Sequence, residues 1–245
     1  QHKDGPFFVY VPHTMPHVPL YASEEFAGTS PRGLYGDVIE EIDWSVGQIT
    51  ETLDRLGLSD NTLVIFTSDN GPWLPYKLKG GSAGLLRGGK SSNWEGGQRV
   101  PCVAKLPGRI PAGSVCRDLA TTMDLLPTIA AMTGSQLPVA RRIDGRDVRS
   151  LLFADASAEV EAQPFIYYTS DGELAGVRRG PWKLKLEPLE LFQIEEDVSE
   201  QWNVAKQHRE LVTELTDLAE QLDAEVTANA RPTRTVTELL FDPAR

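Results

Sequence analysis

A chain of 245 residues can bury one good hydrophobic core, or one core together with a small second domain. The formal net charge of −11, from 24 Lys and Arg against 35 Asp and Glu, argues against nucleic-acid binding, and it means that any anionic ligand needs a local positive site. No run approaches the roughly 18 consecutive apolar residues of a membrane helix. The two cysteines, Cys102 and Cys116, lack metal-ligand spacing, and we expect buried free thiols, with a disulfide as the alternative.

An apolar run, PFFVYV at residues 6–11, predicts a strand close to the start of the chain. A doubly wound sheet rarely begins so abruptly, so we expect the later part of a longer chain. The loop that follows, residues 12–22, is rich in proline and carries His13 and His17. A lone loop histidine is usually a solvated surface residue, but two of them leaving a buried strand make a functional role an equally good hypothesis.

Residues 35–56 give the best helix prediction of the chain, and Gly57 ends it as a C′ residue would. Its apolar residues form one stripe at 4-4-3-4-3 spacing: Val38, Ile42, Val46, Ile49, Leu53 and Leu56. The β-branched and aromatic run at residues 63–67 then predicts a strand buried on both faces, as in a parallel sheet. With residues 6–11 it would complete a right-handed crossover.

The polar residues Asp69 and Asn70 stand at the end of this second strand. Ligands of open α/β sheets bind where strands end in loops, so these two side chains are placed for chemistry. Their hard oxygens suit Ca²⁺ or Mg²⁺ better than zinc. The alternative is a simple tight turn, which the sequence Asp-Asn-Gly also favours.

Residues 71–97 form a long loop with eight glycines: Gly71, Gly80, Gly81, Gly84, Gly88, Gly89, Gly96 and Gly97. Glycines let the backbone approach a ligand closely, and long loops in compact domains are usually functional or disordered. Residues 84–91, GLLRGGKS, match the phosphate-binding P-loop pattern, but no strand precedes them and no helix follows, so we interpret the match as coincidental. Lys90 remains of interest as a local cation.

The second half of the chain changes character near residue 163. Before it, residues 100–106 predict a strand, and residues 119–134 predict a helix in which Asp124 is a capping or buried structural carboxylate. After it, four short strand candidates separated by turns predict an antiparallel meander: residues 164–169, 174–179, 182–187 and 189–194. Leucines at 4-3-4 spacing then predict a helix over residues 207–226 that packs across the meander, and we expect a loosely ordered tail over residues 228–245.

Several of these segments, in this order, resemble successive blocks of the sulfatase family (arylsulfatase-like, in the alkaline-phosphatase superfamily). The blocks are HVPLYASEEFAGTSPRGLYGDVIEEIDWSVG, TLVIFTSDNGP, GGSAGLLRGGKSSNWEGGQRVP, LPGRIPAG and TTMDLLPTIAAMTG. The resemblance implies an α/β fold: the later part of a mixed, mostly parallel sheet flanked by helices, followed by a small antiparallel sheet with one long helix. Residues 1–160 would be the later part of the catalytic domain, and residues 161–245 the C-terminal subdomain.

The resemblance also implies roles for individual residues. Asp69 and Asn70 match one of the two pairs that hold the calcium ion of the family, with Mg²⁺ as the alternative metal. Lys90 matches the sulfate-binding lysine, and His17 the sulfate-binding histidine, so that both are the expected catalytic residues. His13 is a second, less secure match for substrate binding. The substrate would be a sulfate ester, and by resemblance the compartment would be periplasmic, secreted or lysosome-like.

One departure from the family pattern is serious. The nucleophile of the family is a formylglycine made in Cys-x-Pro-x-Arg, and neither CVAKL at Cys102 nor CRDLA at Cys116 fits. The early calcium-binding Asp pair is missing too. We therefore expect the later half of a sulfatase, inactive alone, as a truncated product or as one piece of a split enzyme whose other half joins it in cis or in trans. The alternatives are a phosphoester or phosphonate hydrolase of the same superfamily and a non-catalytic, calcium-binding or structural fragment.

Overall fold

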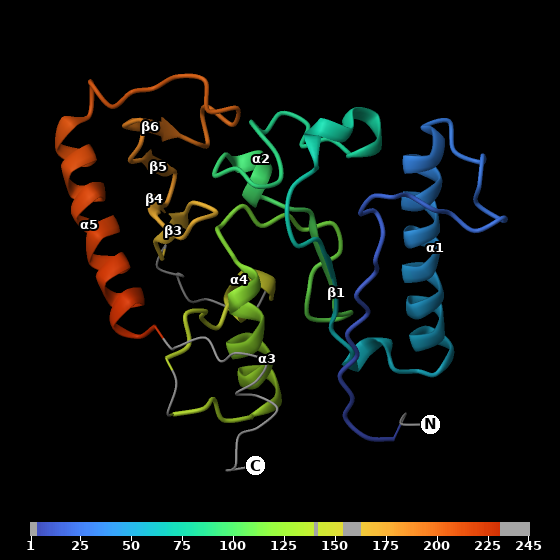
Figure 1. The fold of residues 1–245 in the computed structure, drawn as a ribbon. Helices are drawn as coiled ribbons and strands as arrows, with labels where there is room; N and C mark the ends of the chain where they lie inside the picture. The colour runs from blue at the N-terminus through green and yellow to red at the C-terminus, as the bar shows by residue number, and fades with distance from the viewer. Residues whose placement is uncertain (1–3, 140–141, 154–162, 231–245) are drawn as a thin grey trace, which may run out of the picture.

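The computed structural model describes residues 4–139, 142–153 and 163–230. Figure 1 shows two long helices, α1 (Gly33–Arg55) and α5 (Arg209–Ala228), at opposite ends of the molecule, with a small sheet between them. In the ranges that are described, no helix is both long and apolar enough to cross a membrane. The architecture is thus a mixed α/β arrangement, as predicted.

Helix α1 confirms the predicted helix within two residues at either end. Only the first part of its apolar stripe is covered: Val38 is 1% exposed and Ile42 is 9% exposed, and both pack against Leu20. Farther along, Ile49 and Leu56 lie on the surface. The described residues therefore fully bury only two of the six residues in the stripe that the periodicity identifies.

Among the described residues, the mostly parallel sheet that the sequence predicts is not seen. Residues 6–11 pair with no strand in the described part of the chain, and Phe8 and Tyr10 are 75% and 78% exposed. Strand β1 (Val64–Thr67) pairs antiparallel with β2 (Cys102–Lys105), in a two-stranded sheet. The predicted strand at 6–11 and the crossover are therefore wrong for the described residues, because an apolar run does not specify which strand will satisfy its backbone groups.

Short helical segments connect the middle of the chain. They are η1 (Ser59–Asn61), η2 (Leu74–Lys79), α2 (Glu95–Gln98), η3 (Thr122–Asp124), α3 (Leu125–Thr133) and α4 (Arg149–Leu152). The capping role predicted for Asp124 is confirmed, because its carboxylate accepts hydrogen bonds from the backbone N–H groups of Thr121 at 2.7 Å and Arg146 at 2.8 Å. Gly134 ends α3 in the left-handed conformation, with φ 68°.

The antiparallel meander and its helix are confirmed. Strands β3 (Phe165–Tyr168), β4 (Leu174–Arg179), β5 (Trp182–Lys185) and β6 (Glu190–Gln193) pair in sequence order. Helix α5 covers one face of this sheet (Figure 1). The best-buried core of the chain lies between them: Val177, Leu184, Leu191, Leu215 and Ala219, each 0% exposed. The predicted tail beyond residue 230 lies outside the described residues.

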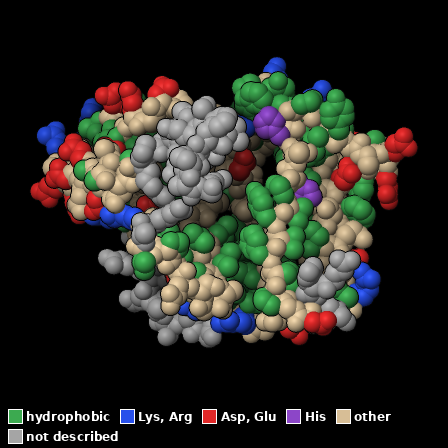
Figure 2. Space-filling view, turned by 60° about the horizontal axis from the view of Figure 1, so that its bottom comes forward, with side chains coloured by type: hydrophobic (Ala, Val, Ile, Leu, Met, Phe, Trp, Pro, Cys, Tyr) green, Lys and Arg blue, Asp and Glu red, His purple; other side chains and the backbone are tan. Residues whose placement is uncertain are grey.

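The two cysteines are free, as expected, but both are exposed, so the prediction of buried thiols is wrong. Cys102 stands opposite Thr67 in the β1–β2 pair, on a sheet that the described residues cover only partly. Figure 2 shows hydrophobic side chains gathered over the middle of the face drawn there, and Phe8, Tyr10 and Val103 are among the exposed hydrophobic residues of the chain. Much apolar surface is therefore unburied in the N-terminal part.

Candidate active site

The end of strand β1 and the glycine-rich loop meet through backbone hydrogen bonds. The N–H of Lys90 donates to the carbonyl of Pro72 at 2.9 Å, and the N–H of Gly71 donates to the carbonyl of Gly97 at 3.1 Å. Because Asp69 and Asn70 directly precede Gly71, these bonds bring the strand end and the Lys90 backbone side by side. The end of β1, the backbone at Lys90 and the backbone at Gly97 thus lie in one small region, although they are separate in sequence.

Glycines make this close approach feasible. A Cβ atom on Gly71 would lie 1.8 Å from the carbonyl oxygen of Gly96, and one on Gly89 would lie 2.4 Å from that of Pro72. A Cβ atom on Gly97 would lie 2.2 Å from the oxygen of Ser92. At these three positions a side chain would force the backbones apart. The glycine content of the loop therefore has a packing cause at the point where Lys90 is held.

His17 and Lys90 both lie against Trp73. The imidazole and indole ring centroids are 5.9 Å apart, and Nζ of Lys90 is 5.9 Å from the centroid of the same indole. Nδ1 of His17 donates to the carbonyl of Val18 at 2.8 Å, because a carbonyl can only accept. The Nε2 atom is consequently left to accept a proton or, once protonated, to donate a hydrogen bond.

Two charged groups of this region, on Lys90 and Asp69, have no counterion among the described residues. Within the described ranges, neither Nζ of Lys90 nor the carboxylate of Asp69 forms an ion pair or a hydrogen bond. The Lys90 side chain is half-buried, and its contact with the indole favours a cation that has lost part of its hydration. Lys90 and His17 thus contact the same indole, and the ammonium group of Lys90 has no ion-pair partner among the described residues.

His13 lies elsewhere. It lines a cavity of about 390 Å³ together with Tyr21, Glu41 and Trp44, beside helix α1. None of the other candidate site residues lines this cavity. The structure therefore brings Asp69, Asn70, Lys90 and His17 to one region through the backbone contacts and Trp73, but it does not add His13 to that group.

A calcium site needs more ligands than the described residues offer here. Asp69 and Asn70 supply two hard oxygen donors, whereas Ca²⁺ takes about six to eight. In the part of the chain that the structure describes, no group of three or more His, Cys, Asp or Glu side chains is arranged to hold a metal. The donor chemistry of the pair fits calcium, but the number of donors does not.

Sequence reasoning missed Trp73, the residue that the two candidate catalytic side chains share, and Tyr76, whose ring lies 4.6 Å from that indole. The available signal was an exposed aromatic pair, WLPY, directly after the strand end. Two loop residues also adopt positive φ without being glycine, Lys77 at 49° and Ser91 at 69°. Such conformations cost energy and persist where surrounding contacts impose them, and here they flank the candidate site.

The sequence profile of the sulfatase family matches residues 1–135. Over 186 residues the chain is 40% identical to the steryl-sulfatase of Rattus norvegicus. This alignment covers 74% of this chain and 32% of the relative. It is 45% identical over 184 residues to the N-acetylgalactosamine-6-sulfatase of Canis lupus familiaris, and this alignment covers 75% of this chain and 34% of that relative. The chain thus spans about a third of the length of these curated relatives.

A solved structure, Ps i-CgsB in complex with k-i-k-neocarrahexaose, has a TM-score of 0.82 and 30% sequence identity, with 97% of this chain and 54% of that one covered. The likeness therefore includes the antiparallel subdomain, which lies beyond the residues that the family profile matches. Profile, relatives and fold agree, and the profile alone spans more than half of the 245 residues. The chain belongs to the sulfatase family.

Proposed function

We propose that this chain forms part of the active site of a sulfuric ester hydrolase, with Lys90 and His17 as its sulfate-binding and catalytic residues. The observation that carries the proposal is the placement of two groups against one indole, next to the end of strand β1: an imidazole, and an ammonium group that forms no ion pair in the described part of the chain. In a chain of net charge −11, such a site supplies the local positive potential that a sulfate ester requires.

The roles of the two residues follow from their chemistry. The ammonium group of Lys90 would attract the sulfuryl oxygens and stabilise the charge that develops on them in the transition state. Nδ1–H of His17 donates to the Val18 carbonyl, and Nε2 has no hydrogen-bond partner among the described residues, so the protonated imidazole could donate from Nε2–H to the departing oxygen. Trp73 would keep both groups in place and exclude water from one side of the site.

The proposal assigns neither the nucleophile nor a metal-dependent step to these residues. Asp69 and Asn70 would provide two ligands of a calcium ion, and the remaining ligands would have to come from groups other than those described. Neither cysteine lies in the Cys-x-Pro-x-Arg sequence from which the nucleophile is made. The chain is therefore expected to need the N-terminal part of a sulfatase, with its formylglycine in place, for turnover of a sulfate ester.

Sulfate binding by the chain itself is the first test. Calorimetric titration with sodium sulfate should give a measurable Kd, and Lys90→Ala should raise it by about tenfold or more, the range for a hydrogen bond to a charged group. Lys206→Ala is the matched control, because Lys206 is an exposed lysine with no ion pair among the described residues. Equal effects of the two substitutions would contradict the proposed role of Lys90.

Hydrolysis of a chromogenic aryl sulfate is the second test. The purified chain should show no turnover, and the same chain joined to the N-terminal part of a sulfatase, or mixed with it, should show it. Equal activity of the two preparations would mean that the nucleophile lies within these 245 residues. A chain that binds sulfate but stays inactive after complementation would favour a non-catalytic role.

A further inference from the structure

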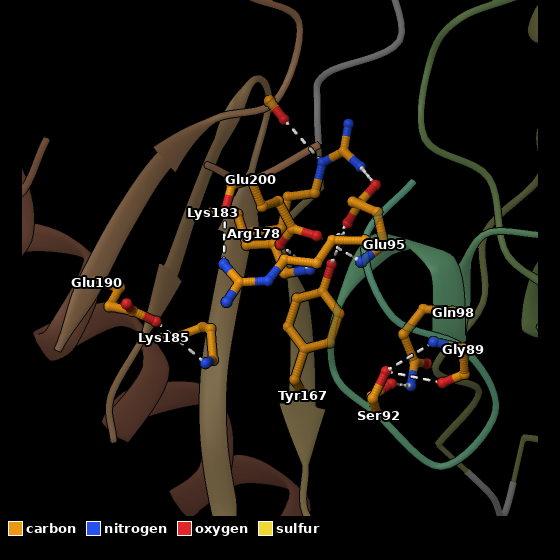
Figure 3. A network of polar contacts seen from close by, with 12 residues as sticks. Gly89, Ser92, Glu95, Gln98, Tyr167, Arg178, Lys183, Lys185, Glu190 and Glu200 are labelled. Carbon is orange, nitrogen blue, oxygen red and sulfur yellow. Dashed lines mark hydrogen bonds and ion pairs between the residues drawn. The ribbon is translucent and has the colours of Figure 1, made fainter. Parts of the chain in front are cut away.

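A buried network of four charged side chains joins helix α2 to the C-terminal sheet (Figure 3). The carboxylate of Glu95, on α2, contacts Nη1 of Arg178 at 2.8 Å and Nζ of Lys183 at 3.0 Å. Nζ of Lys183 also contacts the carboxylate of Glu200 at 2.8 Å. The hydroxyl of Tyr167 donates to Glu95 at 3.4 Å, and burial in this acidic surrounding raises the pKa of that tyrosine well above its usual range.

Strand register explains how these charges come to be buried. Arg178, Lys183 and Phe192 stand opposite one another in β4, β5 and β6, so they share one face of the sheet. Leu184 and Leu191, the adjacent residues in sequence, point to the other face and pack against α5. Both faces of this small sheet are therefore covered, one by α5 and the other by α2 and the glycine-rich loop.

The charges of the network balance, and its solvent exposure is very low. Glu95 is 2% exposed, and Lys183 and Glu200 are each 0% exposed. Two carboxylates face two cations, which limits the large cost of taking charges out of water. Buried ion pairs of this kind add little stability over apolar residues, so stability alone is a weak reason for the network. A better explanation is that the network fixes the position of helix α2 relative to the C-terminal sheet.

Glu200 accepts hydrogen bonds from the glycine-rich loop through two separate groups, its side chain and its backbone carbonyl. Its side chain accepts a hydrogen bond from the backbone N–H of Glu95 at 2.7 Å, and its own carbonyl accepts one from Nη1 of Arg87 at 2.7 Å. Glu200 has φ 51°, in the left-handed region that few non-glycine residues adopt. The hydroxyl of Ser199 also donates to the carbonyl of Leu85 at 2.6 Å. This turn of the C-terminal subdomain is therefore shaped around the loop.

From Glu95 the contact chain to the candidate site is short. Gly96 and Gly97 follow Glu95 in α2, and Gly97 accepts the hydrogen bond from Gly71 at the end of β1. A Cβ atom on Gly97 would lie 2.5 Å from the carbonyl oxygen of Gly89, the residue before Lys90. Any displacement of α2 would consequently move the backbone on both sides of the candidate site.

We propose that Glu95 is a positioning residue: by anchoring α2 to Arg178, Lys183 and Glu200, it fixes the backbone that carries Lys90. The C-terminal subdomain would thus hold the sulfate-binding loop in its working geometry without touching the substrate. This inference rests on the proposed function for the meaning of Lys90, but the anchoring of the loop can be measured separately.

The test uses three variants of the full 245-residue chain. Glu95→Gln keeps the shape of the side chain and removes its charge. Glu95→Gln combined with Lys183→Met restores the charge balance, leaving Arg178 and Glu200, but does not restore the anchor. Glu214→Gln is the matched control, because Glu214 pairs with Arg179 at 2.7 Å on the surface of the same subdomain.

Hydrogen exchange tests the anchoring. Glu95→Gln should speed exchange of the backbone amides of Lys90, Gly96 and Gly97 by about tenfold or more, while amides of β4, β5 and α5 stay protected. The double variant should recover thermal stability but not the protection of these three amides. Unchanged exchange in Glu95→Gln, or recovery of protection together with stability in the double variant, would overturn the proposal.

Sulfate binding and kinetics test the consequence for function. In both Glu95 variants the Kd for sulfate should rise by about tenfold, and in the complemented enzyme kcat should fall by up to about 100-fold, the loss expected when a catalytic group is misplaced by about an ångström. Glu214→Gln should leave all these values unchanged. A wild-type chain that binds no sulfate would refute the proposed function, while the exchange data would still decide whether Glu95 anchors the loop.

Discussion

Replacing Lys183 by methionine probes the buried network most directly. The side chain of Lys183 is 1% exposed, and its Nζ lies 3.0 Å from one carboxylate and 2.8 Å from another. Methionine fills nearly the same volume, so the main loss is the cation between Glu95 and Glu200. Breaking a buried ion pair by removing one partner costs about 3–5 kcal/mol, because the remaining charge is left buried and uncompensated. Arg178 can still balance only one of the two carboxylates.

Urea unfolding followed by circular dichroism measures this cost. The free energy of unfolding of Lys183→Met should fall by about 3–5 kcal/mol. Arg179→Met is the control, since its pair with Glu214 has side chains 36% and 59% exposed, and it should cost no more than about 1 kcal/mol. Similar losses for the two variants would show that the pairs at Lys183 are not desolvated, and the reasoning from burial would fail.

Four further predictions concern single features. Gly97→Ala should disorder the turn at Ser92 and weaken sulfate binding, whereas Gly47→Ala, in open space on α1, should raise the unfolding free energy by roughly 0.5–1 kcal/mol. The backbone N–H groups of Gly28 and Ser30 lower the pKa of Asp37, so its stabilising contribution should be present above about pH 4 and lost as the pH falls further, and Asp37→Asn should flatten that acid limb of the stability profile. In the complemented enzyme, Lys90→Ala should lower kcat by about 10²–10³. Calorimetry should find that Ca²⁺ binds the isolated chain more weakly than micromolar, since two donors cannot fill its shell.

Local patterns predicted the helices and the meander well. The apolar spacing in α1 and α5, and the turns at Gly172 and Gly180 with φ 83° and 56°, are properties of short stretches of sequence. The sheet of the N-terminal part was predicted wrongly because pairing is not local. The run at 63–67 was expected to be buried on both faces, yet Phe66 is 37% exposed and its partner strand begins only at Cys102.

The candidate site shows the same division between local and distant information. The strand end at Asp69 and Asn70 and the loop around Lys90 were recognisable, because each lies in one continuous block of sequence. The buried network around Lys183 could not be recognised from the sequence, because Lys183 and Glu95 are 88 positions apart. In sequence, Lys183 resembles an outward-facing residue of a strand that is half exposed. Only the covering of the second sheet face by α2 turns it into a buried cation.

The cations of this region differ in their roles because their surroundings differ: some have partners within the chain, whereas Lys90 has no ion-pair partner among the described residues. The guanidinium group of Arg87 lies 3.6 Å from the centroid of the Trp94 ring and donates to the carbonyl of Glu200, so it is committed to holding the loop against the C-terminal subdomain. Arg178 and Lys183 are neutralised by buried carboxylates. Lys90 has no such partner among the described residues, and its charge is therefore available to an incoming anion. Because carboxylates already pair with Arg178 and Lys183, Lys90 is better placed than either of them to attract an anion, which agrees with its proposed role as the sulfate-binding cation.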